Sequence, residues 1–284
     1  MTKQSGNNQN LDLGVYPSIS DPLFKKLRDF IYVRTGISMK PHKKVLIANR
    51  LRKRVRNLGL SSYDEYYNYL IENEAIELEN FIDSVSTNET FFFRGKDHFD
   101  VLSQFLLPEL FRKKDRINIW SAACSSGEEP YTLRIIINDI ISSLGRGVAK
   151  IIATDISHEI IEKAKTGIYK NYSTRFVPSA TLKRYFQKEG EVYKLKEAVK
   201  KGVQFKVQNL LHDRPPDNNF DIIFCRNVMI YFDRKTKQRI ADDVFAEVLQ
   251  PDGYLFIGHS ESLNYVSSRF KYVRKLNAPV YMLK

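Results

Sequence analysis

The polar residues best suited to chemistry follow an apolar segment in the last third of the chain. The run Phe220–Asp233 (FDIIFCRNVMIYFD) begins as an apolar segment and then changes abruptly to Arg226, Asn227 and Tyr231. In an open α/β sheet, ligands bind just beyond the carboxyl ends of the strands. Polar and aromatic side chains at this position therefore predict a site where a cofactor meets a substrate.

A second candidate lies in Trp120–Pro130 (WSAACSSGEEP), where a strand leads through small residues into a helix. Small side chains let backbone amides approach a ligand, and a helix N-terminus favours anionic groups. Gly127 is the only glycine of a GxGxxG pattern, and Glu128 and Glu129 add negative charge, which does not favour a pyrophosphate. The pattern favours a cofactor with an ammonium, a sulfonium or ribose hydroxyls. Alternatively, both glutamates only stabilise the helix N-terminus.

Asp155 follows the next predicted strand, 150–153. A carboxylate at this point of a doubly wound sheet accepts hydrogen bonds from the ribose hydroxyls of an adenosine cofactor. The alternative is that Asp155 caps the helix that follows.

The segment Ser86–Arg94 (STNETFFFR) joins two differently patterned parts of the chain. Ser86 and Glu89 fit a capping box, and the three phenylalanines are expected in the core. That account leaves Arg94 unexplained, because a charge directly after three aromatic residues needs a partner or a function.

The elements before residue 116 show only helical patterns. They predict a tail over 1–19 that is disordered, a helical domain over 20–85, and a linker with a connecting helix over 86–115. Asp21 is expected to cap the first helix, with Pro22 in its first turn. A second helix, about 43–58, carries an apolar stripe at helical spacing, Ile47, Leu51, Val55 and Leu58.

The other faces of this second helix carry a set of basic residues. Charge-rich faces are often simply solvated, but the density here favours a docking surface. The predicted partner-binding residues are Lys43, Arg50, Lys53, Arg54 and Arg56.

From residue 117 onward, β-rich apolar runs alternate with amphipathic helical ones. Strands are expected at 117–120, 150–153, 204–207, 221–224 and 254–257, with helices at 130–143, 158–166 and 234–249. The alternation predicts an α/β domain over 116–284, with a doubly wound, Rossmann-like parallel sheet. The chain should end in an antiparallel hairpin at the sheet edge, and a small subdomain is expected near 180–203.

Composition narrows the class of protein. The 284 residues are 43% hydrophobic, which suits a globular core, and no run of about 18 apolar residues predicts a membrane span. The polar N-terminus is unlike a signal peptide, and two cysteines make no disulfide framework, so a reducing cytoplasm is expected. The five histidines show no metal-binding spacing, and no metal site is expected. The net charge of +12 favours an acidic partner: nucleic acid, anionic lipid or protein.

Together these segments resemble the CheR family, the bacterial chemotaxis receptor glutamate O-methyltransferases, from about residue 20 onward. The motifs that carry the resemblance are Ser86–Arg94, Gly127–Tyr131 (GEEPY), Thr154–Asp155, Asn209–Leu211 (NLL), Cys225–Tyr231 (CRNVMIY) and Gly258–Glu261 (GHSE). Several independent segments in the family's order make the resemblance specific.

The resemblance implies a helical domain joined to a class I methyltransferase domain that uses S-adenosylmethionine. It places Arg94 and Tyr231 nearest the transferred methyl group, and it does not decide between Glu128 and Glu129 as the cofactor contact. It implies that the basic helix holds the cytoplasmic helical region of a chemoreceptor, without membrane insertion. The implied cofactor-binding residues are Asn88, Thr90, Arg94, Glu128, Asp155, Asn209, Leu210, Arg226 and Asn227.

One segment departs from part of the family. Some members carry a glycine-rich insert that captures a pentapeptide at the receptor's C-terminus, whereas the matching stretch Tyr185–Lys194 is short and contains only Gly190. The sequence therefore predicts methylation that needs no such tether.

Two other functions remain as alternatives. A nucleic-acid methyltransferase would suit the charge, but Arg226–Tyr231 lacks the Pro-Pro-Tyr segment of such enzymes and Cys225 does not follow a proline. The presence of Arg94, Asp155 and Tyr231 argues against a non-catalytic module that only senses S-adenosylmethionine. We therefore expect no nucleic-acid partner.

Overall fold

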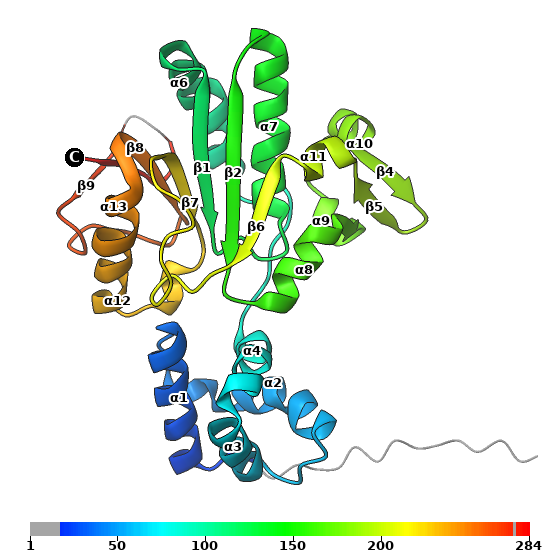
Figure 1. Ribbon diagram of the computed structural model, residues 1–284, viewed down its shortest axis with the longest axis vertical. Helices are drawn as coiled ribbons and strands as arrows, with labels where there is room; N and C mark the ends of the chain where they lie inside the picture. Colours follow the sequence, from blue (N-terminus) through cyan, green and yellow to red (C-terminus); the bar gives the residue numbers. More distant parts are fainter. Residues whose placement is uncertain (1–17, 275–276) are drawn as a thin grey trace, which may run out of the picture.

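The computed structural model describes residues 18–274 and 277–284. A helical domain lies at one end and an α/β domain at the other (Figure 1). Most of the predicted tail, residues 1–17, lies outside the described residues. Within the described part of the chain, no helix is long and apolar enough to cross a membrane.

The helical domain packs its helices around one apolar core that includes Leu27, Leu51 and Phe81. The first helix is capped by Ser20, whose Oγ accepts from the backbone N–H of Leu23, and this corrects the expectation of a cap at Asp21. The elements are α1 (Asp21–Thr35), the 3₁₀ turn η1 (Pro41–Lys43), α2 (Lys44–Asn57), α3 (Tyr63–Glu72) and α4 (Glu74–Val85).

A buried carboxylate ties α2, α3 and α4 together. Glu77 is fully buried and receives a hydrogen bond of 2.6 Å from Arg54 Nε and one of 2.8 Å from the Tyr66 hydroxyl. Removing one partner of such a buried pair costs about 3–5 kcal/mol. Arg54 is therefore part of the domain's internal structure, and its guanidinium is not free for a partner.

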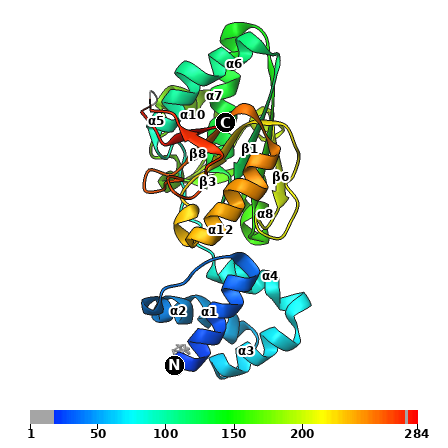
Figure 2. The same ribbon diagram turned by 90° about the vertical axis from the view of Figure 1, so that its left-hand side faces the viewer.

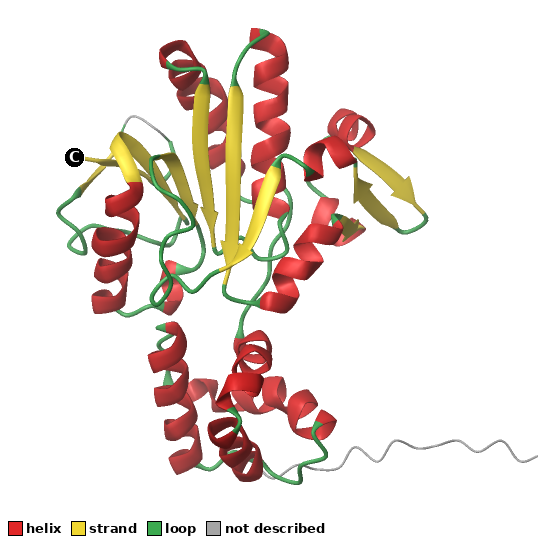
Figure 3. Ribbon diagram, in the orientation of Figure 1, coloured by secondary structure: helices red, strands yellow, loops and turns green. Residues whose placement is uncertain are grey.

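The connecting segment leads into a seven-stranded sheet with the order β6-β2-β1-β7-β8-β10-β9. Strands β6, β2, β1, β7 and β8 are parallel, and β10 and β9 add an antiparallel edge, which confirms the doubly wound sheet and the C-terminal hairpin (Figure 3). The elements are α5 (Lys96–Val101), η2 (Leu102–Leu106), α6 (Leu107–Lys113), β1 (Arg116–Ala122), α7 (Glu128–Leu144), β2 (Val148–Asp155), α8 (His158–Thr166), β6 (Val203–Val207), β7 (Phe220–Cys225), η3 (Met229–Tyr231), α12 (Arg234–Arg239), η4 (Ile240–Phe245), α13 (Ala246–Val248), β8 (Leu249–Ile257), β9 (Phe270–Tyr272) and β10 (Val280–Leu283).

The central strand β7 is apolar except for Asp221, and its packing shows why. Successive side chains of a strand point to opposite faces, and a parallel sheet is covered on both. Ile222 and Phe224 therefore join the core on one face, whereas Ile223 and Cys225 join the core on the other. This packing fixes where the strand ends and its polar residues begin.

A second, antiparallel sheet of three strands, in the order β3-β5-β4, lies beside the main sheet (Figure 3). Its strands are short and include charged residues, so the sequence pattern did not predict them. The elements are β3 (Ile168–Lys170), α9 (Asn171–Thr174), α10 (Ser179–Tyr185), β4 (Phe186–Glu189), β5 (Val192–Leu195) and α11 (Glu197–Lys200).

The helical domain meets the α/β domain at the carboxyl ends of the parallel strands (Figures 1 and 2). The C-terminal part of α1 makes much of this contact. The Tyr32 hydroxyl donates to Asp233 at 2.8 Å, and Asn209 Nδ2 donates to the carbonyl of Arg34 at 2.7 Å. Because these contacts reach the segments after β6 and β7, the helical domain lies over the predicted site.

Candidate active site

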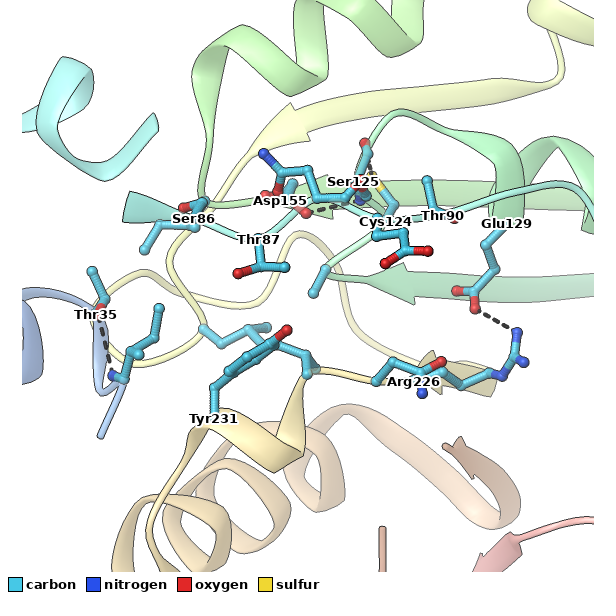
Figure 4. Close-up of a pocket in the computed structure, with 18 of the residues that line it drawn as sticks. Thr35, Ser86, Thr87, Thr90, Cys124, Ser125, Glu129, Asp155, Arg226 and Tyr231 are labelled. Carbon is cyan, nitrogen blue, oxygen red and sulfur yellow. Dashed lines mark hydrogen bonds and ion pairs between the residues drawn. The ribbon is translucent and has the colours of Figure 1, made fainter. Parts of the chain in front are cut away.

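A pocket lies where the carboxyl ends of β1, β2 and β7 face the helical domain (Figure 4). Thr35 and Ile37 close it from the helical side, and the linker 86–91 forms another wall. In the strand order, β1 lies between β2 and β7. The chain therefore extends the sheet from β1 in one direction through β2 and β6, and later in the other direction through β7 and β8. Ligands bind at such a switch point in open α/β sheets.

The turn between β1 and α7 brings backbone close to the pocket. Ala123 and Ser125 have positive φ, and so does Gly127 at 91°. A Cβ at Gly127 would lie 3.0 Å from the Cβ of Ala164 and 3.1 Å from the Tyr169 hydroxyl. Glycine is therefore required here by both conformation and space, and small residues let the turn line the pocket.

Asp155 ends β2 inside the pocket, with its carboxylate held by backbone groups. It accepts hydrogen bonds from the N–H groups of Ser125 at 2.8 Å and of Ser157 at 3.1 Å. Burial raises the pKa of Asp155, and these hydrogen bonds act in the opposite direction. Helix α8 is capped by the side chain of Ser157, so capping does not account for Asp155.

The two adjacent glutamates of α7 point to different places. Glu128 is buried outside the pocket lining, where it accepts from the hydroxyls of Ser126 at 2.7 Å and Ser173 at 2.9 Å, and burial raises its pKa. Glu129 lines the pocket. The structure therefore favours Glu129 over the predicted Glu128 as the cofactor contact, because successive helical residues are rotated by about 100°.

Arg226, at the end of β7, is joined to Glu129 across the pocket. The ion pair measures 3.0 Å from Nη1, and Nη2 donates to the carbonyl of Arg94 (Figure 4). Arg94 in turn donates from Nη1 to the carbonyl of Glu89 at 2.8 Å. These contacts give both arginines partners and leave them lining the pocket.

The linker does not form the predicted capping box. Ser86 ends α4, and its Oγ donates to the carbonyl of Ile82 at 2.7 Å, so no helix begins there. Of the three phenylalanines, Phe92 is fully buried, whereas Phe91 lines the pocket. An extended linker instead presents successive side chains to the ligand site.

Tyr231 extends into the pocket opposite Asp155, from the short turn η3 (Figure 4). Hydrogen bonds from two sides hold this turn in place. The carbonyl of Tyr231 accepts from the N–H of Ser38 at 2.8 Å. The Glu261 carboxylate accepts from the N–H groups of Asn227 at 3.0 Å and Ile230 at 3.2 Å. Glu261 is buried beside this loop and is not part of the pocket lining. Its role is to position the loop.

The pocket brings together nearly all of the predicted site residues, and Glu128 is the exception. Sequence reasoning also missed Thr35 and Ile37, because no local signal shows that the helical domain closes the pocket. The predicted residues that line it are Asn88, Thr90, Arg94, Asp155, Asn209, Leu210, Arg226, Asn227 and Tyr231.

The five predicted partner-binding residues separate into two groups. Arg54 is paired with Glu77, and Arg50 donates to the carbonyl of Val85 and to Thr87 Oγ1 at 2.6 Å. Because Thr87 lines the pocket, Arg50 lies beside it. Burial lowers the pKa of Arg50, and Tyr231 acts in the opposite direction. The exposed residues of the set are Lys43, Lys53 and Arg56.

A strand-end carboxylate and a turn of small residues at a switch point define a nucleotide-type cofactor site of a doubly wound α/β fold, here covered by an N-terminal helical domain. Asp155 fits the ribose of an adenosine cofactor such as S-adenosylmethionine, because it lines the pocket and has only backbone N–H partners. The sequence matches the CheR methyltransferase SAM binding domain over residues 88–278 and the CheR methyltransferase all-alpha domain over residues 22–86. The chain belongs to the CheR methyltransferase family.

Curated relatives agree over nearly the whole length. A chemotaxis protein methyltransferase of Borreliella burgdorferi is 38% identical, covering 92% of this chain and 93% of the relative. The one from Escherichia coli is also 38% identical, covering 89% and 88%. Chemotaxis protein methyltransferase 1 of Pseudomonas aeruginosa is 35% identical, covering 92% and 97%. The protein is therefore an S-adenosylmethionine-dependent methyltransferase of chemotaxis.

Proposed function

We propose that the acceptors are glutamate side chains in the cytoplasmic helical domain of chemoreceptors, which become glutamate methyl esters. The observation that carries this proposal is the pocket lining, which contains neither histidine nor lysine among the residues that the structure describes. A glutamate carboxylate is already deprotonated at neutral pH, so its methylation needs no general base. A lining with arginines and a tyrosine suits the binding of a carboxylate.

The residues hold the reactants rather than exchange protons with them. When bound, S-adenosylmethionine would supply a methyl group on a positively charged sulfur: a carboxylate oxygen would bond to the methyl carbon as the carbon–sulfur bond breaks, and S-adenosylhomocysteine would leave. Asp155 holds the ribose, and Tyr231 orients the acceptor from the opposite wall. Arg94, which also lines the pocket, binds the second carboxylate oxygen. Such positioning contributes about 7–11 kcal/mol to catalysis in favourable cases.

The cysteines give no support to the alternative of a nucleobase acceptor. Cys225 is fully buried outside the pocket lining, and burial raises the pKa of its thiol well above the usual value. Cys124 lines the pocket, but burial likewise raises the pKa of its thiol well above the usual value. Neither thiol is suited to act as a nucleophile.

The helical domain formed by α1–α4 is the proposed docking domain. Lys43, Lys53 and Arg56 are exposed cations on η1 and α2, and Arg50 of the same helix donates to Thr87, which lines the pocket. An acidic helical bundle placed on this surface would bring its glutamates to the pocket opening. The proposed place of action is the cytoplasm, at membrane-bound receptors.

In this proposal the receptor needs no C-terminal pentapeptide tether, because the small sheet has no inserted loop that could capture it. Strands β4 and β5 pair from Glu189 with Val192, so the hairpin turn contains only Gly190 and Glu191. A two-residue turn leaves no loop to enclose a pentapeptide.

A methyl-transfer assay tests the acceptor. The full chain is incubated with tritiated S-adenosylmethionine and either receptor-containing membranes or RNA, and volatile methanol is measured after treatment with base. We expect base-labile label in the receptor alone. Label that resists base, or label in RNA, would contradict a glutamate ester.

The Asp155→Ala variant links this activity to the pocket. Loss of the ribose contact should weaken the binding of S-adenosylhomocysteine, measured by calorimetry, by about 10- to 100-fold, since hydrogen bonds to charged groups contribute about 1.5–3 kcal/mol. An Asp64→Ala variant, which changes an acidic residue in the first turn of α3 outside the pocket, is the control. Equal affinities for the two variants would remove Asp155 from the cofactor site.

A further inference from the structure

Outside the pocket, the first turn of α5 and the loop after β8 bring together a carboxylate and two imidazoles: Asp97, His98 and His259. We propose that these three side chains bind one divalent transition-metal ion of the zinc class. The expectation from the sequence was that no metal site exists. Spacing could not reveal this cluster, because Asp97 and His259 lie 162 residues apart.

The distances suit a shared ion. One ligand atom from each residue lies within 4.8 Å of the other two. Asp97 Oδ1 is 3.7 Å from His98 Nδ1, and Asp97 Oδ2 is 2.9 Å from His259 Nε2. Zinc binds imidazole nitrogen and carboxylate oxygen at about 2.0–2.2 Å. An ion between the three groups would replace the Asp97–His259 contact, and solvent would complete its coordination.

His98 provides independent support because one of its ring nitrogens has no partner. The side chain is fully buried, and Nε2 donates to the carbonyl of Ile257 at 2.7 Å. Nδ1 therefore carries the lone pair, and it has no hydrogen-bond partner among the described residues. A backbone carbonyl that fixes the far nitrogen is the usual support of a metal-bound histidine. An ion would satisfy the buried Nδ1.

The nearby charges are compatible with a cation. Burial, with a smaller effect from Arg226, lowers the pKa of His98 to about 4, so the ring is neutral at pH 7, as a ligand must be. The positive charge of Arg226 is balanced by its ion pair with Glu129. Asp97 and His259 line a surface cavity together with Glu261, so an ion can reach them from solvent.

The location indicates what the ion would hold in place. Asp97 and His98 follow the segment whose Arg94 carbonyl accepts from Arg226, and His259 precedes Glu261, which holds the loop after β7. A bound ion would join these two supports of the methyltransferase pocket. Its role would be structural, and it does not depend on which substrate is methylated.

Calorimetric titration of the tag-free full chain with zinc sulfate tests the site. We expect one equivalent to bind, with affinity at least about 10-fold lower in His259→Ala and in Asp97→Asn. His259 has a side chain 54% exposed, so its replacement leaves the core intact. His158→Ala, which removes an exposed imidazole at the start of α8, is the matched control and should bind zinc as the unchanged protein does.

Thermal unfolding gives a second readout. Zinc should raise the Tm of the unchanged chain and of His158→Ala, because a ligand stabilises the folded state that binds it. The rise in Tm should be much smaller for His259→Ala. The proposal fails if the unchanged protein binds no zinc, or if His259→Ala and His158→Ala bind it equally.

Discussion

At the scale of single residues, the site separates groups that touch a ligand from groups that hold others in place. Tyr231 and Asp155 line the pocket from opposite sides, whereas Glu261 reaches the pocket only through the backbone of the Asn227 loop. This division matters for mutations, because replacing a lining residue removes its own contact, whereas replacing Glu261 would displace contacts that other residues make.

Replacing Tyr231 by Phe tests the proposed role of its hydroxyl. The ring keeps its packing, but the acceptor loses an orienting hydrogen bond, so kcat should fall by about 10- to 100-fold. The Kd for S-adenosylhomocysteine should change little, because Asp155 is unaltered. Steady-state kinetics with receptor membranes and calorimetry with the product measure the two effects.

A Tyr172→Phe variant is a suitable control for this prediction. It removes the same hydroxyl from an exposed tyrosine whose partner is the Glu89 carboxylate at 3.1 Å, and Tyr172 is not in the pocket lining. We expect a much smaller loss of kcat. If Tyr231→Phe weakened product binding and left kcat unchanged, Tyr231 would be a binding residue for the cofactor side.

At the scale of elements, α2 carries paired and exposed basic residues on different faces. Arg54 faces inward to Glu77 and stabilises the packing against α3 and α4, whereas Lys53 and Arg56 are exposed. Helical spacing identified Ile47, Leu51 and Val55 correctly as buried, whereas Leu58, the fourth predicted member of the stripe, is only half-buried at the C-cap of α2. It could not show that one basic residue of the opposite faces is paired, because Glu77 lies in a different helix.

The double variant Lys53→Ala/Arg56→Ala should weaken receptor use through the loss of long-range attraction. Exposed charge pairs contribute about 0.2–1 kcal/mol each, so the KM for receptor should rise by about 2- to 30-fold at low salt. Added salt should raise the KM of the unchanged enzyme and reduce this difference, since screening lengths are about 8 Å at physiological ionic strength. Initial rates at several salt concentrations measure both effects.

Arg112→Ala/Lys113→Ala makes the same change of charge on α6, at the end of the α/β domain away from the helical domain (Figure 1). Its KM for receptor should stay close to that of the unchanged enzyme. Equal effects of the two double variants would mean that net charge, rather than the α2 face, attracts the receptor. A KM that does not depend on salt would argue against an electrostatic docking surface altogether.

At the scale of the whole molecule, the sequence predicted the features that follow from the order of the parallel strands. Asp155 and Arg226 could be placed at one edge because the carboxyl ends of parallel strands lie together. The choice of Glu129 over Glu128 could not be made, since it depends on how α7 is rotated against Ser126 and Ser173.

Other features escaped prediction for different physical reasons. The sequence predicts a small subdomain near 180–203 but not the strands of the small sheet, because these short strands do not alternate clearly between apolar and polar residues, as Phe186–Glu189 shows. The closure of the pocket by Thr35 and Ile37 depends on how two domains pack, which no local pattern contains.

The last prediction concerns the small sheet and the C-terminal tail of the receptor. A tether that fits its site raises the effective concentration of the substrate, and its loss can cost about 100-fold or more. The hairpin of β4 and β5 has a turn of only Gly190 and Glu191, so we expect no such contribution here. Removing the C-terminal tail of a receptor should therefore change kcat/KM by less than about twofold, measured with full-length and shortened receptors in the same membranes.

The free tail peptide is the control, because it isolates tail binding from any disturbance of the receptor. If the tail makes no contact with the enzyme, excess peptide leaves the methylation of both receptor forms unchanged. A tenfold or larger loss on shortening the receptor, together with inhibition by the peptide of the full-length form alone, would show that a tail-binding site exists despite the short turn. A loss without peptide inhibition would place the effect in the receptor, since the enzyme would then have no measurable affinity for the tail.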